Sequence, residues 1–62
     1  MKTDNKAKWA AKLILDKSRR CEVELVTSDK VYVREMDGET PISRTETTER
    51  NLLIAILSEL TS

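Results

Sequence analysis

This chain of 62 residues has no histidine, no phenylalanine, and only one each of cysteine, glycine, proline and tryptophan. Histidine is the most common catalytic base and metal ligand, so its absence excludes most catalytic and metal sites. The single thiol, Cys21, cannot form an internal disulfide or a zinc site with four protein ligands. One glycine excludes a glycine-rich phosphate loop. We therefore expect no enzyme activity, no bound cofactor and no metal site.

Long apolar runs are also missing. The longest unbroken one, residues 52–57, is far shorter than the roughly 18 residues of a membrane-spanning helix. The basic N-terminal stretch resembles the start of a signal peptide, but Lys8 and Lys12 interrupt it. A lone cysteine is typical of a reducing compartment. We expect a cytoplasmic protein that has no membrane partner.

The most conspicuous feature that is present is an uneven distribution of charge. Residues 1–20 contain seven lysines and arginines against two aspartates, whereas residues 21–62 contain four basic and nine acidic residues. The whole chain has a formal net charge of zero and an isoelectric point near 6.2. This asymmetry suits either self-assembly or a polyanionic partner.

The length indicates a single domain, residues 1–62. A chain of this size buries only about 60% of the surface that its unfolded form exposes, and it is often stabilised by disulfides, metals or oligomerisation. The first two are excluded by composition. We therefore expect a homo-oligomer, most simply a dimer, or a tight complex with a larger protein.

Residues 4–19 have the pattern of an amphipathic helix, with Thr3 or Asp4 as N-cap. The apolar side chains cover an arc of about 240° when placed at 100° per residue. Three alanines, Ala7, Ala10 and Ala11, occupy the middle of this arc, where another backbone can approach closely. The arc is wider than one core requires, which predicts a second contact on this helix.

The middle of the chain has the alternation and turn residues of a β meander. Residues 21–27 and 31–36 alternate between apolar and polar side chains, and Cys21 falls on the inward side as either a structural or a reactive thiol. Asp37-Gly38 predicts a two-residue hairpin in which both residues have positive φ. A short third strand at residues 39–43 would follow, at an edge because Pro41 has no N–H to donate.

The last part of the chain predicts a second helix that ends near residue 60. Ser43 and Glu46 have the spacing of a capping box, and Thr45 or Thr47 are alternative caps. The six apolar residues 52–57 make this the most core-like segment of the sequence.

The expected fold class is therefore α+β, an α-β-β-β-α mini-domain in which an antiparallel meander carries both helices on one face. If the third strand does not form, the order is α-β-β-α. Five residues are left on the solvent face of the sheet in this architecture, namely Glu22, Glu24, Tyr32, Arg34 and Met36.

This order and length resemble the double-stranded-RNA-binding domain in topology. In that family the second helix begins with a lysine cluster that grips phosphates. The corresponding stretch here, residues 45–50, reads TETTER and is acidic rather than basic. The resemblance implies duplex RNA as an alternative partner, and the departure in charge weighs against it.

Two sets of candidate site residues follow from these patterns. The candidate protein interface comprises Trp9, Leu13, Tyr32, Arg34 and Met36. The candidate phosphate contacts of the alternative reading are Lys8, Lys12, Arg19 and Arg20. An isoelectric point near 6.2 and the position of Asp16 on the lysine stripe argue against a dedicated nucleic-acid binder. We therefore expect a small non-enzymatic regulator or inhibitor that acts by protein–protein binding, of the type that phages and mobile elements encode, with nucleic-acid binding as the alternative.

Overall fold

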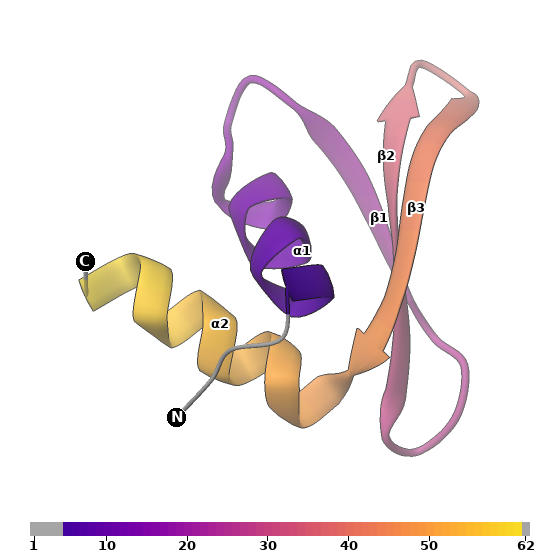
Figure 1. Ribbon diagram of the computed structural model, residues 1–62. Coiled ribbons are helices and arrows are strands. Elements are labelled where there is room, and N and C mark those ends of the chain that lie inside the picture. Colours follow the sequence, from indigo (N-terminus) through magenta and orange to yellow (C-terminus); the bar gives the residue numbers. More distant parts are fainter. Residues whose placement is uncertain (1–4, 62) are drawn as a thin grey trace.

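The computed structural model describes residues 5–61, which form a helix, three strands and a second helix (Figure 1). The elements are α1 (Asn5–Leu15), β1 (Arg20–Leu25), β2 (Lys30–Asp37), β3 (Thr40–Thr48) and α2 (Glu49–Thr61). The α-β-β-β-α order expected from the sequence is confirmed, and the third strand forms. The caps proposed for the first helix, Thr3 and Asp4, lie outside the described residues.

Helix α1 ends at Leu15, four residues before the end that the sequence pattern predicts. Asp16 is the cause, because its side-chain Oδ1 accepts hydrogen bonds from the Ser18 backbone N–H and hydroxyl, at 2.9 and 2.7 Å. An aspartate that bonds the backbone two residues later offers the chain a turn in place of another helical step. The basic residues after it therefore lie in the connection to β1 and in β1 itself.

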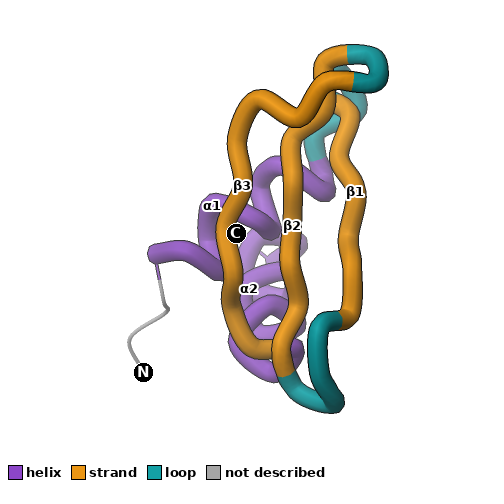
Figure 2. Tube along the Cα trace, turned by 90° about the vertical axis from the view of Figure 1, so that its right-hand side faces the viewer, coloured by secondary structure: helices purple, strands orange, loops and turns teal. Residues whose placement is uncertain are grey.

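The three strands form an antiparallel sheet in the order β1-β2-β3. Val31 and Val33 of the central strand face the helices and are buried, while Tyr32 and Arg34 point to the other face. Figure 2 shows the sheet from this outer side, with both helices behind it. The predicted single-faced arrangement is confirmed.

The hairpin between β2 and β3 differs by one residue from the sequence prediction. Asp37 pairs with Thr40, so that Gly38 and Glu39 form the two-residue loop. Gly38 has a φ of 64°, and no other described residue has a positive φ. A glycine with positive φ at the first loop position is typical of a type II′ turn, whereas the sequence suggested a type I′ turn at Asp37-Gly38.

Strand β3 is longer than predicted, and the start of α2 is correspondingly later. The polar stretch TETT continues the strand to Thr48, because β-branched threonines suit a pleated edge. Thr47 is buried against the helices. The N-cap of α2 is Thr48, whose Oγ1 accepts from the Asn51 N–H at 3.1 Å. The capping box of Ser43 and Glu46 is therefore wrong, since both residues lie within the strand.

This cap leads to a first prediction. Thr48→Ala should lower the free energy of unfolding by about 1 kcal/mol, because it leaves an N–H of the first turn of α2 without its acceptor. Ser43→Ala is the matched control, and it should change stability by less than about 0.5 kcal/mol because it is an exposed strand residue. Urea unfolding of the two variants measures the difference. Equal losses would contradict the cap assignment.

The core lies where α1 meets both the sheet and α2. Leu13 and Ala10 pack with Val31, Val33 and Leu52 in the larger cluster. Ala7 and Ala11 pack against Ala55 of α2 in a second cluster. The alanine stripe thus admits another backbone as predicted, and that backbone belongs to α2. The wide apolar arc of α1 is covered within the chain.

Helix α2 is less buried than its sequence predicts. Figure 1 shows it leaving the end of β3 and running away from the sheet, beside α1. Only Leu52 and Ala55 of this helix are buried, and Ile56 is partly buried against them. Leu53 and Leu57 are more than half exposed. The prediction that residues 52–57 are the most core-like segment is therefore wrong, since a helix that leaves the sheet can bury only the side that touches α1.

Candidate protein-binding surface

Helix α2 has a second apolar side that no part of the described chain covers. Leu53, Leu57 and Leu60 are 54%, 62% and 64% exposed. Their spacing of four and three residues places them in one stripe along the helix. Leu52 and Ala55 occupy a different side, against α1. We call Leu53, Leu57 and Leu60 the leucine stripe.

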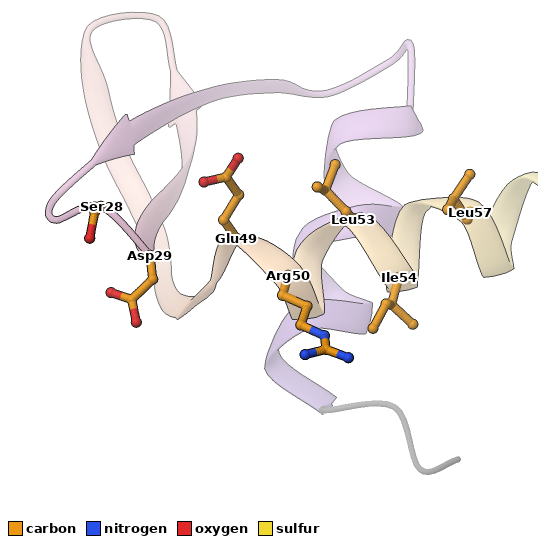
Figure 3. Close-up of a pocket in the computed structure, with 7 residues that line it drawn as sticks. All are labelled: Ser28, Asp29, Glu49, Arg50, Leu53, Ile54 and Leu57. Carbon is orange, nitrogen blue, oxygen red and sulfur yellow. The ribbon is translucent and has the colours of Figure 1, made fainter.

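The first part of this stripe borders a pocket of about 500 Å³ at the junction of α2 with the β1–β2 loop (Figure 3). The pocket is lined by Ser28, Asp29, Glu49, Arg50, Leu53, Ile54 and Leu57. In Figure 3 the leucines point to one side of the helix, and Arg50 and Ile54 to the other. The loop is held against the helix by the Glu49 N–H, which donates to the Asp29 carbonyl oxygen at 2.7 Å. The pocket thus has an apolar wall and a charged rim.

A second uncovered apolar region lies on β1. Val23 and Leu25 lie on the side of the sheet that carries the helices, because they pair with the buried Val33 and Val31. They are nevertheless 51% and 66% exposed, so neither helix covers these two side chains. Cys21, on the same side, is partly buried against the core.

The predicted protein interface is not brought together by the fold. Trp9 is partly buried at the edge of the core, on the helix side of the sheet. Leu13 is completely buried and therefore cannot contact a partner in this fold, which corrects its assignment to an interface. Tyr32, Arg34 and Met36 lie on the opposite face of the sheet from Trp9.

On that outer face the side chains are already engaged with one another. Arg34 bonds Glu22 at 3.2 Å and lies 3.3 Å from a carboxylate oxygen of Glu24. The Arg44 guanidinium lies over the Tyr32 ring, 5.9 Å from its centroid. Cross-strand pairs of this kind are typical of a solvated sheet face. The face is charged and most of its charges are paired, although the Arg34 Nε is buried there without a hydrogen-bond partner. Its charge distinguishes it from the leucine stripe.

The candidate phosphate contacts are divided between two elements and one connection. Lys8 and Lys12 are exposed on α1, and Arg20 is exposed at the start of β1. Arg19 is engaged elsewhere, because its guanidinium donates two hydrogen bonds to the Glu35 carboxylate, one of them from Nε at 2.9 Å. A bidentate pair of this kind leaves fewer donors for a phosphate. The other three candidates make no ion pair with any residue between 5 and 61.

The ion pair between Arg19 and Glu35 joins the end of the α1–β1 connection to the central strand. Hydrogen bonds from Arg19, and then its charge, hold the pKa of the Glu35 carboxyl below its ordinary value of 4.5, although burial acts in the opposite direction. A carboxyl whose pKa is lower in the folded state stabilises the fold above its unfolded pKa. That stabilisation is lost as the pH falls through the folded pKa.

This pair predicts acid sensitivity. The thermal midpoint should fall between pH 6 and pH 3, and Glu35→Gln should reduce the size of that fall because it removes one titrating carboxyl. Hydrogen bonds from Ser18 also lower the pKa of Asp16, so part of the dependence should persist in the variant. Melting curves by circular dichroism measure both. A pH dependence identical in the two proteins would contradict the role of Glu35.

Within residues 5–61, no group of three or more cysteine and acidic side chains is placed to hold a metal ion. Neither of the two helices over the same residues is long and apolar enough to cross a membrane.

The spacing of the leucine stripe is visible in the sequence, because positions 53, 57 and 60 follow one another at four and three residues. Ile56 and Leu60 are also four residues apart, so the apolar arc of this helix is continuous from Leu52 to Leu57. What the sequence could not show is which part of this arc α1 would cover. Comparison of the chain with models of protein families, with curated proteins and with solved structures found no match.

Proposed function

We propose that this protein is a small non-enzymatic regulator or inhibitor that binds a larger protein by placing α2 in an apolar groove of that partner. The observation that carries the proposal is the leucine stripe, whose three side chains are each more than half exposed. We place this activity in the cytoplasm, because the lone thiol of Cys21 suits a reducing compartment.

The shape of α2 supports a groove as the binding site on the partner. The helix runs away from the sheet and is supported on one side by α1 (Figure 1). Leucines at spacings of four and three residues are the anchors by which amphipathic helices dock into apolar grooves. Because α1 contacts only one side of α2, the side with the stripe is free to enter a groove without unfolding.

The charges around the pocket of this protein indicate which charge the rim of the partner's groove should carry. Asp29 and Glu49 contribute two carboxylates and Arg50 one guanidinium, so the pocket rim is net negative. Charge complementarity chiefly governs the choice of partner and the rate of association. The partner should therefore present a basic side chain beside the part of its groove that receives the first turn of α2.

Substitutions in the stripe test the proposal. Leu57→Asp with Leu60→Asp should abolish binding to the partner, since carboxylates would replace two apolar anchors that the partner's groove would bury. Ile42→Asp is the matched control, because Ile42 is 56% exposed on β3, away from α2. The tagged proteins are used to capture partners from lysate of the source cells. A captured protein is then purified and its affinity measured by calorimetry.

The expected result is saturable one-to-one binding by the parent and by Ile42→Asp, with at least a hundredfold loss in the double variant. A partner that binds all three proteins equally would overturn the assignment to α2. If no captured protein binds the parent tighter than about 100 μM, the proposed function fails. Circular dichroism should show the same fold in all three proteins.

Nucleic-acid binding is the alternative, and salt dependence separates it from the proposal. If Lys8, Lys12 and Arg20 contact phosphates, three contacts predict a log–log slope of affinity on salt near −2.7 for duplex DNA. We expect instead no binding of duplex DNA or RNA tighter than about 100 μM at 150 mM salt, because the acidic part of the chain repels the backbone. Fluorescence anisotropy measures this. A micromolar complex with that slope, which Lys8→Ala with Lys12→Ala reduces by about two units, would overturn the proposed function.

A further inference from the structure

Strand β1 is a sheet edge with unpaired backbone groups. It pairs only with β2, and the Val26 N–H donates to the Lys30 carbonyl oxygen at 3.0 Å. Residue pairs along an antiparallel ladder alternate between hydrogen-bonded pairs and pairs that are not hydrogen-bonded to each other. The backbone groups of Cys21, Val23 and Leu25 therefore point away from β2, toward the open edge.

The opposite edge of the sheet is protected in ways that β1 is not. On β3, Pro41 has no N–H to donate, and the register shifts opposite Glu35 and Met36. Bulges and prolines are devices by which natural edges avoid further pairing. The β1 edge has neither, and the register with β2 is continuous from Arg20 to Leu25. If the sheet is extended by another strand, it is extended at β1.

The side chains of β1 indicate what that strand would be. Val23 and Leu25 present an apolar surface on the helix side, at 51% and 66% exposure. On the outer side the order is Arg20, Glu22, Glu24. The two carboxylates share Arg34, and Arg20 makes no ion pair within residues 5–61. A strand that brings an arginine to Glu24 and a carboxylate to Arg20 would complete this pattern, and β1 itself is such a strand.

We propose that β1 pairs antiparallel with β1 of a second copy of this chain, with Glu22 opposite Glu22 on the two-fold axis. In this register Arg20 of each copy faces Glu24 of the other, which makes two opposite-charge pairs. Cys21 of each copy faces Val23 of the other, and their outward backbone groups form the hydrogen-bonded pairs. The one like-charge pair, at Glu22, lies beside Arg34 of each copy.

The neighbouring registers are less favourable. A shift that places Val23 opposite itself sets Glu22 against Glu24 twice, and like charges directly opposite each other are destabilising. A shift in the other direction places Cys21 opposite itself and leaves only residues 20–22 of the two strands overlapping. The proposed register alone among the three combines two attractive pairs with an overlap of five residues, 20–24.

The resulting assembly closes on itself. An interface formed by the same strand in both copies is isologous, so it produces a dimer and leaves no free β1 edge. The two sheets join into one sheet of six strands with the protected β3 strands outside. Val23 is partly covered by Cys21 of the other copy, and Leu25 lies just beyond the overlap. The leucine stripe is not needed for this contact, so the dimer and the proposed function stand or fall separately.

Disulfide trapping reads the register directly, because each register places a different residue opposite itself. In the proposed dimer the two Glu22 Cα atoms form a non-hydrogen-bonded pair about 4.5 Å apart, within the range for a disulfide. Three variants in a Cys21→Ser background carry one thiol each, at Glu22→Cys, Val23→Cys or Glu24→Cys. These and the parent with Cys21 are oxidised at micromolar concentration and separated on non-reducing gels.

The expected result is a covalent dimer for Glu22→Cys alone. A dimer formed predominantly by Val23→Cys, by Glu24→Cys or by the native Cys21 would overturn the proposed register, and no dimer in any of them would overturn the contact. Sedimentation equilibrium supplies a test without cross-links. Arg20→Glu should weaken the dimer by on the order of tenfold, and adding Glu24→Arg should restore it. If the double variant dissociates as much as the single one, the Arg20–Glu24 pairs do not exist.

Discussion

Leu13→Ala should leave much of the chain unfolded at 37 °C. Leu13 is fully buried and packs in the cluster that joins α1, β2 and α2. Truncating a buried leucine to alanine costs about 2–5 kcal/mol, because transfer free energy is lost and a cavity remains. A core of this size supplies only about 3–5 kcal/mol in total. One substitution therefore removes most of the margin, which thermal melting by circular dichroism would show.

Leu53→Ala is the matched control for this prediction. Leu53 is also a helical leucine, but it is 54% exposed and belongs to the leucine stripe. The sequence alone suggested a core position for Leu53, at which truncation to alanine would lower the free energy of unfolding as much as it does for a buried leucine. The structure predicts a loss below about 1 kcal/mol, because little buried volume is removed. Equal destabilisation by Leu13→Ala and Leu53→Ala would mean that α2 packs differently from Figure 1.

Ala55→Leu should have the second largest effect. Ala55 is 1% exposed and packs against Ala7 and Ala11, which are fully buried. A larger side chain at this point would push the two helices apart. Overpacking of a close contact typically costs about 1–3 kcal/mol. We expect a lower urea midpoint and an α2 that is less firmly held on α1.

Hydrogen exchange locates this effect. The amides of α2 should exchange faster in Ala55→Leu than in the parent. The exchange rates of the β2 amides should rise by no more than the loss of global stability requires. Ser58→Leu is the control, since Ser58 is exposed on the same helix. If Ala55→Leu is as stable as the parent, the alanine contact is not the reason that the helices lie so close.

The binding proposal also depends on this contact. Because α2 is supported by α1 and only the end of β3, loss of the alanine packing should weaken the groove-bound complex as well as the fold. A partner affinity that falls in Ala55→Leu but not in Ser58→Leu would therefore link the stability of α2 to recognition.

Local chemistry in the sequence determined the kind and order of the elements. Alternation at residues 21–27 and 31–36 predicted two strands, and Asp37-Gly38 predicted their hairpin to a third. The alanine stripe of the first helix predicted a close approach by another backbone. These inferences succeeded because period, turn residues and side-chain size act over a few residues.

The boundaries were less accurate where two local preferences compete. Residues 45–48 carry both strand-forming threonines and good helix caps, and tertiary pairing with β2 decided in favour of the strand. Asp16 ended α1 early because its side chain satisfied the backbone of Ser18. Such outcomes depend on which of two hydrogen-bonding arrangements of the backbone is more stable in the folded chain, and the periodicity of the sequence does not contain that information.

The candidate surfaces were decided by the tertiary structure alone. Both helices carry more apolar residues than one contact can bury, and the sequence does not indicate which apolar side will be covered. The fold covers α1 on both the sheet side and the α2 side, and covers α2 only where it meets α1. Leu13 thus became core, while Leu53, Leu57 and Leu60 remained exposed, because the direction in which α2 leaves β3 determines which apolar side finds a neighbour.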